Sequence, residues 1–293
     1  MIDVRVKTFL TVCSYMNFTH AAEKLHLTQP AVSQHIKYLE KYYGTTLFIR
    51  EKRNLTLTPA GEILRHALEA MQNDESTIQK RIQESMTGQK TLTFGVTMTI
   101  GEYAVVPALA RFIKQHPETN FHIRYGNTQV LLNALKNGSI DFAIVEGYFP
   151  TNYYHTRIYR TEEYVAVTAK NHNFAGPVRC LQDLTKECLL IRESGSGTRE
   201  ILTRMLALNN LSVSDFPHYV EVENIHTIVS LLKQDCGISF LYKTAVEKEL
   251  QRDQLELIHL PDMKIQHDFT FLWNKGSIFS DEYERICMEL QMR

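Results

Sequence analysis

The chain has 293 residues, a length that exceeds a typical single domain and predicts two or three compact units. Its apolar content of 44% and charged content of 22% are typical of a soluble globular protein, and no apolar run is long enough for a membrane helix. The five scattered cysteines form no C-x-x-C pair and charges interrupt the N-terminus, so we expect a reduced, cytoplasmic protein rather than an exported one.

The net charge of −1 is unevenly distributed along the chain. Residues 1–58 carry eight Lys and Arg against four Asp and Glu, whereas the remaining residues carry 24 against 29. The N-terminal part is therefore basic and the rest acidic. This asymmetry favours phosphate contact by one domain and a different task for the other.

Three short helices are predicted at the N-terminus. The first has an apolar stripe between Val6 and Cys13, and it is expected to pack behind the other two. The second covers 18–25 and contains two adjacent alanines, Ala21 and Ala22, which are small enough to let another helix cross closely. The arrangement predicts a helix-turn-helix.

The third helix, at 30–41, has a buried face and an outward polar face. Thr28 can cap it, and Pro30 fits its first turn because proline lacks an N–H. Its apolar residues recur at helical spacing, as Val32, Ile36 and Leu39. We expect these three to point into the core and the polar residues between them to face outward.

Such an outward face can read DNA. Amide and hydroxyl side chains can pair with base edges in the major groove, while lysine and arginine suit phosphates. The segment 46–57 alternates loosely around a charged tip, as a two-stranded wing does. Any small three-helix domain shares the apolar spacing, but that alternative leaves the polar face and the basic wing unexplained. The candidate DNA-binding residues are Thr28, Gln29, Pro30, Ser33, Gln34, Lys37, Arg50, Lys52 and Arg53.

One long helix is predicted from Pro59 to about Thr87, with Thr58 as its cap. Its apolar stripe advances in steps of four and three residues, the rhythm of a coiled-coil seam, and therefore predicts a dimer. Alternatively, the stripe packs on its own chain. The stripe consists of Leu64, Leu68, Met71, Ile78 and Ile82, with Glu75 as a polar departure.

After a candidate hinge at 88–90, strands and helices alternate to the end of the chain. The pattern includes strands at 92–96, 121–125, 140–145, 164–168, 189–191, 219–222, 238–241, 255–260 and 268–273. Helices are expected at 101–115, 128–136, 198–209 and 225–234, with a short one from 244 and a last one from 280. This alternation indicates α/β sheets, in which ligands collect beyond the carboxyl ends of the strands.

About forty positions of the N-terminal region resemble the LysR-type transcriptional regulators. The matching residues are Ala21-Ala22, the run TQPAVSQHIKYLE at 28–40, Gly44, Leu47-Phe48 and the run LTPAG at 57–61. The resemblance implies a cytoplasmic, ligand-responsive DNA-binding regulator that dimerises through the linker helix and also forms tetramers. Its expected partners are double-stranded DNA, a small effector and further copies of the chain.

The resemblance extends over the whole chain and implies three parts. These are a winged helix-turn-helix at 1–58, a linker helix at 59–88 and an α/β effector-binding domain at 89–293 of the two-lobed, periplasmic-binding-protein type. Lobe I is expected at 91–161 with 267–293, and lobe II at 162–266. The customary Gly-x-Gly before one strand is replaced by Asp235-Cys236-Gly237, where Asp can adopt the left-handed conformation.

Three strand-to-helix turns, at 97–101, 126–129 and 194–199, carry small polar residues with free backbone amides. Helix N-termini favour anions, although ordinary helix capping would use the same residues. The family resemblance implies that the three turns face one cleft between the lobes, where they would bind a small anionic effector. The third turn resembles a family subset that includes regulators of sulfur assimilation, which implies an oxyanion such as sulfite or sulfate. A carboxylated metabolite is an equally admissible alternative. The candidate effector residues are Thr97, Thr99, Ile100, Asn127, Thr128, Glu146, Ser194, Ser196 and Thr198.

Nearby charges modify that expectation. Arg192 and Arg199 could add bidentate contacts or form ordinary salt bridges, and Glu146 would disfavour a doubly charged ligand unless it is protonated or paired. Cys236 is interpreted as a buried filler rather than a thiol sensor.

Other classes of protein fit less well. No nucleophile is accompanied by a base, the glycine-rich turn lacks the ending of a phosphate-binding loop, and the twelve histidines lack metal-ligand spacing. We therefore expect no catalytic residue, no metal and no cofactor. A transport solute-binding protein would share the two lobes but would need an export signal in place of the basic N-terminal motif.

Overall fold

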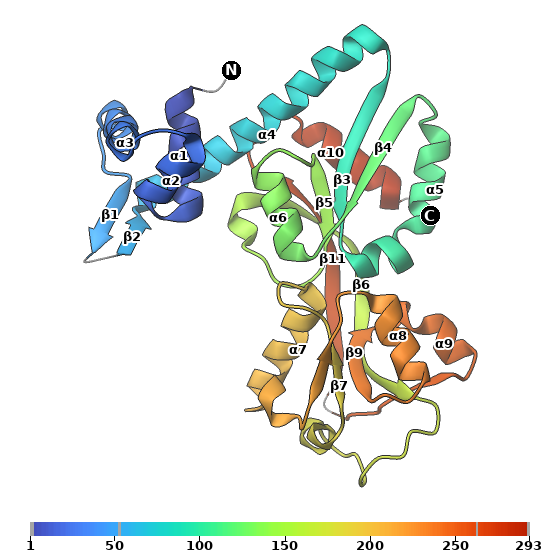
Figure 1. Cartoon of the computed structure of the whole chain (residues 1–293). Coiled ribbons are helices and arrows are strands. Elements are labelled where there is room, and N and C mark those ends of the chain that lie inside the picture. Colours follow the sequence, from blue (N-terminus) through green and yellow to red (C-terminus); the bar gives the residue numbers. More distant parts are fainter. Residues whose placement is uncertain (1–2, 52–53, 262, 292–293) are drawn as a thin grey trace.

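The computed structural model describes residues 3–51, 54–261 and 263–291. Figure 1 shows a small N-terminal head, a long helix and an elongated α/β body of two lobes joined by long strands. Within the described residues, no helix is both long enough and apolar enough to cross a bilayer.

The head consists of α1 (Val4–Tyr15), α2 (Phe18–Leu25) and α3 (Gln29–Tyr43), followed by the hairpin of β1 (Phe48–Glu51) and β2 (Asn54–Leu57). The predicted inward residues Val32, Ile36 and Leu39 are confirmed as buried. They join Phe9, Val12, Ala21 and Ala22 in one apolar cluster. The turn between α2 and α3 closes through His26 in the left-handed conformation, so the helices cross as a helix-turn-helix.

The long helix α4 (Pro59–Thr87) begins at the predicted cap, because the Thr58 hydroxyl accepts a hydrogen bond of 2.9 Å from the Gly61 amide. The predicted stripe divides into two parts. Leu64 and Leu68 pack into the core of the head, as the alternative interpretation expects. Met71, Ile78 and Ile82 are 59%, 41% and 58% exposed.

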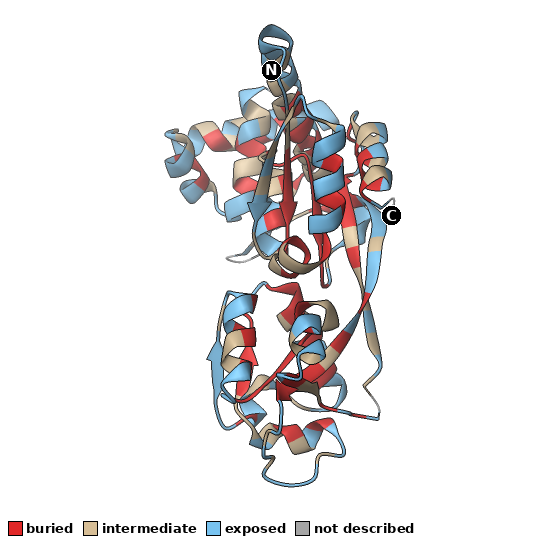
Figure 2. Ribbon diagram, turned by 90° about the vertical axis from the view of Figure 1, so that its right-hand side faces the viewer, coloured by how far each residue is buried: buried red, intermediate tan, exposed pale blue. Residues whose placement is uncertain are grey.

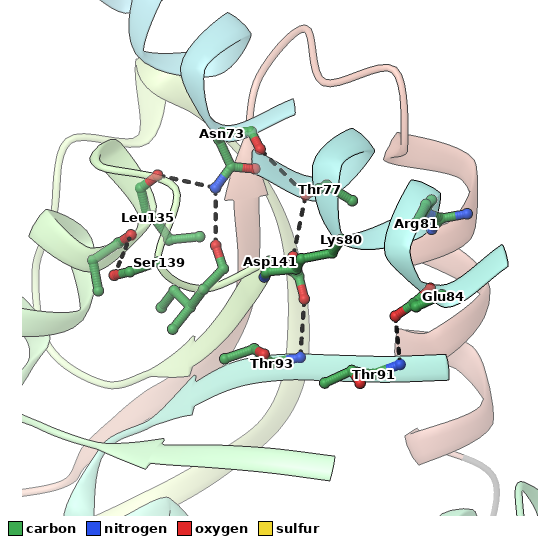
Figure 3. Close-up of polar contacts among 12 residues, drawn as sticks. Asn73, Thr77, Lys80, Arg81, Glu84, Thr91, Thr93, Leu135, Ser139 and Asp141 are labelled. Carbon is green, nitrogen blue, oxygen red and sulfur yellow. Dashed lines mark hydrogen bonds and ion pairs between the residues drawn. The ribbon is translucent and has the colours of Figure 1, made fainter. Parts of the chain in front are cut away.

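Another face of α4 docks on the body through buried polar groups (Figure 3). Asn73 Nδ2 donates to the carbonyls of Leu135 and Ile140 at 3.1 and 2.9 Å. The Thr77 hydroxyl and the Lys80 ammonium both contact Asp141 Oδ1 at 3.2 Å. Periodicity along α4 did not indicate this docking, because the partners lie more than sixty positions away in the sequence.

In the described residues, nine strands form one connected set with the order β4-β3-β5-β11-β6-β9-β7-β8, and β10 pairs with β6. They are β3 (Lys90–Val96), β4 (Thr119–Tyr125), β5 (Phe142–Val145), β6 (Tyr154–Ala169), β7 (Leu189–Ile191), β8 (Tyr219–Glu221), β9 (Ile238–Tyr242), β10 (Leu255–Leu257) and β11 (Ile265–Asn274). The antiparallel pair β6 and β11 belongs to both lobes. In the lobe that contacts α4, β5 pairs with the carboxyl-terminal part of β11. In the other lobe, β9 pairs with the carboxyl-terminal part of β6.

Helices cover the strands of each lobe. In Figure 2 the buried residues, drawn in red, lie on the strands and on the helices packed against them. The lobe that contacts α4, here the near lobe, carries α5 (Val106–Gln115), α6 (Thr128–Lys136) and α10 (Ser280–Gln291). The far lobe carries α7 (Gly197–Leu208), α8 (Ile225–Lys233) and α9 (Glu247–Gln251). Short helical turns are η1 (Ile100–Ala104), η2 (Thr151–Tyr153), η3 (Leu181–Lys186), η4 (Val213–Asp215) and η5 (Lys243–Ala245).

Two predicted elements are corrected. The strand predicted at 164–168 begins ten residues earlier, at Tyr154, because its first half is stabilised by pairing with β11 rather than by burial of alternate side chains. The helix predicted at 101–115 is split at Val105 into η1 and α5. Pro107 cannot donate a backbone hydrogen bond, so it fits the first turn of a new helix better than the middle of a continuous one.

Candidate functional site

The first candidate site is the outer surface of the head. A groove of about 660 Å³ lies between α3, the start of α2 and the wing, and it brings Gln29, Ser33, Lys37 and Arg50 to one surface. Gln29 Nε2 donates to Ser33 Oγ at 2.8 Å, which aligns these two polar side chains along the helix. An amide, a hydroxyl and a cation on a helix, beside a second cation on a hairpin, suit a DNA duplex.

Three further predicted DNA-binding residues lie outside the lining of this groove. Thr28, Pro30 and Gln34 are exposed, and Thr28 also caps α3 by accepting a 3.3 Å hydrogen bond from the Ala31 amide. Lys52 and Arg53 lie outside the described residues.

Sequence reasoning missed two polar residues that line the same groove, Asn17 and Thr19. The Asn17 side chain caps α2 by accepting hydrogen bonds from the Thr19 and His20 amides at 2.9 and 3.2 Å. The signal was available, because an Asn directly before a predicted helix is a strong N-cap candidate, and helix N-termini attract phosphates.

Local contacts hold the wing against the helices. Glu40 Oε1 of α3 accepts a 2.9 Å hydrogen bond from the Leu47 amide at the start of the wing. At the other end, the Thr58 hydroxyl donates to the Thr46 carbonyl at 2.8 Å. A Cβ on Gly61 would lie 2.2 Å from the Leu47 carbonyl oxygen, so only glycine allows α4 to approach this closely. Arg50 is thereby held at a set position relative to α3.

The second candidate site lies between the lobes, around Glu146 at the end of β5. Glu146 Oε1 accepts hydrogen bonds from Thr99 of the near lobe at 3.3 Å and from Thr198 of the far lobe at 2.7 Å. The Thr128 hydroxyl donates to the Glu146 carbonyl at 2.7 Å. All four residues are buried. The structure therefore brings the three predicted turns together around one residue.

The lobes touch at two glycines beside this carboxyl. Gly147 has a φ of 83°, and a Cβ there would lie 2.4 Å from the Cα of Gly197. A Cβ on Gly197 would lie 2.3 Å from the Glu146 carbonyl oxygen. A side chain at either position would force the lobes apart. The role of Gly147 was missed, although a glycine after the last residue of a buried strand signals a close backbone approach.

Several buried polar atoms around Glu146 have no hydrogen-bond partner. They are Thr97 Oγ1, Ser196 Oγ, Arg192 Nη1, Tyr242 OH and Glu146 Oε2. A buried polar atom without a partner costs about 1–3 kcal/mol, so a group of them indicates a site that a ligand or water would complete. Tyr242 was missed because it ends a mostly apolar strand and therefore resembles a core residue.

Burial governs the acid–base properties of the cleft. It raises the pKa of Glu146 above the ordinary carboxylic acid value, although Thr198, Arg192 and Thr99 favour the charged form. It also raises the pKa of Tyr164 and Tyr242 well above that of a free phenol. The Tyr164 hydroxyl donates to the Thr198 carbonyl at 2.8 Å and thereby fixes the turn that holds Glu146.

Three predicted effector residues lie apart from the Glu146 carboxyl. Asn127 sits at the rim, where Nδ2 contacts Glu193 Oε1 at 3.4 Å and the Ser194 carbonyl at 3.5 Å. Ser194 is exposed. Ile100 is fully buried in the main core, so only its backbone could face a ligand.

The charged and thiol candidates also have definite environments. Arg192 is 3% exposed and pairs with Glu193 at 2.8 Å, whereas Arg199 pairs with Glu221 and donates to the Arg192 carbonyl.

The prediction that Cys236 is a buried filler is wrong, because it is exposed. Asp235 adopts the predicted left-handed conformation with a φ of 57°. Among the described residues, no three His, Cys, Asp or Glu gather as a metal site would require.

Comparison with protein families identifies both parts of the chain. Residues 4–62 match the bacterial regulatory helix-turn-helix protein family of lysR type, and residues 87–283 match the LysR substrate binding domain. The chain is 29% identical over 269 residues to the HTH-type transcriptional regulator CysL of Bacillus subtilis, and the matched region spans 91% of this chain and 89% of CysL. A "Probable RuBisCO transcriptional regulator" of Thalassiosira pseudonana is 26% identical, and the matched region spans 98% of this chain and 95% of that protein.

Solved structures share the fold at lower identity. Full-length LysG from Corynebacterium glutamicum, with bound effector Arg, superposes with a TM-score of 0.61 at 16% identity and covers 99% of this chain and 98% of that one. An H2O2-bound cysteine mutant of OxyR from the same organism gives 0.59 at 22% identity, covering 98% and 91%. The chain therefore belongs to the LysR family and is a transcriptional regulator with a helix-turn-helix head and a two-lobed effector-binding body.

Proposed function

We propose that the head reads DNA sequence with two sets of residues. Gln29, Ser33 and Gln34 contact base edges, whereas Lys37 and Arg50 contact phosphates. The single groove that holds Gln29, Ser33, Lys37 and Arg50 supports this division, because amides and hydroxyls discriminate bases and cations at phosphates do not.

Binding to a panel of promoter fragments at several salt concentrations tests the two roles. We expect Lys37→Ala to weaken all fragments alike and to lower the salt slope by about one, because one phosphate contact is lost. Gln29→Ala should instead change the preference among fragments. Equal losses on every fragment from both variants would contradict the assignment of Gln29 to base readout.

The effector is a small anion bound between the lobes. Thr97, Ser196 and Arg192 supply buried donors that have no hydrogen-bond partner, and they lie beside Thr99, Thr128 and Thr198. A site so rich in donors suits a carboxylate or an oxyanion, including a sulfur oxyanion. The backbone of Ile100, together with Asn127 and Ser194, borders the entrance. Two proteins of this fold support an anion, since the Synechocystis CcmR regulatory domain is in complex with 2-PG and a mutant OxyR2 regulatory domain from Vibrio vulnificus is sulfate-bound.

Glu146 accompanies the anion in its protonated form. Two negative charges in a buried site repel each other, and burial already favours the neutral acid. Above the pKa of Glu146, anion binding therefore takes up a proton, and the affinity falls as the pH rises through this raised pKa. The Glu146→Gln variant should bind with an affinity that does not depend on pH over this range.

The chain acts as a homodimer, or as a homotetramer built from such dimers. The exposed residues Met71, Ile78 and Ile82 of α4 form an apolar row that a second α4 can cover. Paired linker helices would hold two heads at a set separation on DNA, and effector binding would change that separation by altering the arrangement of the lobes.

Thermal unfolding in the presence of sulfate, sulfite and a series of small carboxylates tests the cleft. We expect at least one anion to raise the Tm of the wild type and to have no such effect on Thr198→Val, which removes the hydroxyl that contacts Glu146. DNA footprinting with the active anion then tests the regulatory link. An anion that stabilises Thr198→Val as strongly as the wild type would place the effector elsewhere.

A further inference from the structure

A second cavity lies at the other end of β3, beneath α4. It has a volume of about 320 Å³ and is enclosed by α4, the start of β3, α5 and α10. The Glu146 cleft follows the carboxyl end of β3, whereas this cavity begins at Lys90 and Thr91, at its amino end. At about 3.3 Å per residue, the two sites are separated by roughly 20 Å.

The wall of this cavity is partly apolar. Leu92 of β3, Phe112 of α5 and Ile286 of α10 all contribute to it. Phe112 is 4% exposed and Ile286 is 8% exposed, so both are held by the core of the near lobe and form a preformed surface. A cavity of this size, at the lower end of the range for ligand sites, suits the apolar body of a small molecule.

The acidic residues that line the cavity are already engaged. Glu282 pairs with Arg81, and Glu289 contacts His116 Nε2 at 2.7 Å. Glu84 Oε1 accepts a 2.5 Å hydrogen bond from the Thr91 amide, as Figure 3 shows. Asp141 is bound by Thr77 and Lys80. Cations therefore neutralise Glu282 and Asp141, whereas Glu84 and Glu289 are hydrogen-bonded by the Thr91 amide and the His116 ring.

Two cations at the cavity have no such partner. Within the described residues, the side chains of Lys90 and Arg285 make no ion pair and no hydrogen bond, although both line the cavity. They come from different elements, the start of β3 and the middle of α10. Both residues are exposed, and their charged groups remain available to an anionic group of a ligand.

A buried hydroxyl gives an independent sign of a missing ligand. Tyr283 lines the cavity and is 1% exposed, yet its hydroxyl makes no hydrogen bond of normal geometry, although Thr77 lies nearby. Burial raises the pKa of this phenol, so the hydroxyl stays protonated and available as a donor. A buried hydroxyl without an acceptor destabilises the protein, so a ligand oxygen that accepts from it would be favourable.

We propose that this cavity is a second ligand site, which binds a small amphipathic monocarboxylate. The apolar body of the ligand contacts Leu92, Phe112 and Ile286. Its carboxylate accepts hydrogen bonds from Arg285 and Lys90, and an oxygen reaches the Tyr283 hydroxyl. Because the walls come from both α4 and the near lobe, such a ligand holds the linker helix against the body.

The site can be tested by titrating the full chain with hexanoate and benzoate while following the fluorescence of Trp273. This is the only tryptophan of the sequence, and its ring centroid lies 6.4 Å from that of Tyr283. We expect a saturable change in the wild type. Arg285→Gln should raise the Kd at least about tenfold, because a charge-assisted hydrogen bond is lost, and Tyr283→Phe should raise it about fivefold.

Matched controls distinguish this cavity from the Glu146 cleft and from a general loss of surface charge. Lys114→Gln removes a cation from the exposed side of α5, outside the cavity, and should leave the Kd unchanged. Thr198→Val alters the Glu146 cleft and should also leave it unchanged. The proposal is overturned if neither carboxylate gives a saturable change, if hexanol binds as tightly as hexanoate, or if Thr198→Val abolishes binding while Arg285→Gln does not.

Discussion

The junction between α4 and the near lobe and the cleft around Glu146 are both built from buried polar side chains, but they differ in how completely these are hydrogen-bonded. At the junction, Asn73, Thr77 and Asp141 all have partners, and Tyr283 at the edge of the neighbouring cavity is the exception. In the cleft, five polar atoms lack partners. Complete pairing is typical of a structural contact, whereas incomplete pairing is typical of a surface that awaits a ligand.

The largest effect is expected from Asp141→Ala at the junction. Asp141 accepts hydrogen bonds from Thr77, Lys80 and the Thr93 amide, so its loss leaves one partly buried cation and the buried Thr93 amide without an acceptor, whereas the Thr77 hydroxyl keeps the Asn73 carbonyl. We expect the free energy of unfolding to fall by about 3–5 kcal/mol. Urea denaturation measures this change. Glu118→Ala, at an exposed turn, is the control and should change the value by less than about 0.5 kcal/mol.

Asn73→Ala is expected to have the next largest effect. The variant leaves the carbonyls of Leu135 and Ile140 without the Nδ2 donor, which should cost about 2 kcal/mol. Gln79→Ala, on the exposed face of the same helix, keeps the helix propensity and should be nearly neutral. Equal losses from both variants in urea denaturation would show that the docking of α4 does not depend on this amide.

The stability effect of Glu146→Gln should depend on pH. Because burial raises the pKa of Glu146 in the folded state, the unfolded chain loses its proton at lower pH than the folded chain does. The wild type is therefore destabilised progressively as the pH rises from the unfolded pKa to the folded pKa, and glutamine avoids this loss. In thermal unfolding from about pH 4 to about pH 8, the Tm of the variant should rise relative to that of the wild type as the pH increases. Plots of Tm against pH that run parallel for the two proteins would contradict this prediction.

The smallest effect on stability is expected from Tyr242→Phe in the cleft. This hydroxyl is buried without a partner, so its removal should change the free energy of unfolding by less than about 0.5 kcal/mol or raise it. Ser239→Ala is the matched control, because the Ser239 hydroxyl donates to the Leu190 carbonyl at 2.7 Å and its loss should cost about 1 kcal/mol. A larger loss from Tyr242→Phe would mean that its hydroxyl is already satisfied in the free protein.

Features that depend on neighbours along the chain could be predicted from the sequence. The cap at Thr58, the inward face of α3 and the helix at Thr128–Lys136 are confirmed, because each depends on residues within one or two helical turns. The three polar turns were identified for the same reason, since small polar residues directly before a helix are a local signal. Their convergence around one residue was expected only through the family resemblance.

The sequence by itself determined the position of the head and the candidate polar residues of the turns through local periodicity and capping, and it determined the class of the protein through the resemblance of its N-terminal motif to the LysR family. Only the tertiary structure decided that Asn73 and Thr77 are buried, that β6 extends back to Tyr154, and that Tyr242 and Gly147 border the cleft. The partners of these residues lie far away in the chain. Burial and pairing between distant segments leave no periodic pattern in the sequence, because each side of the contact is polar or irregular by itself.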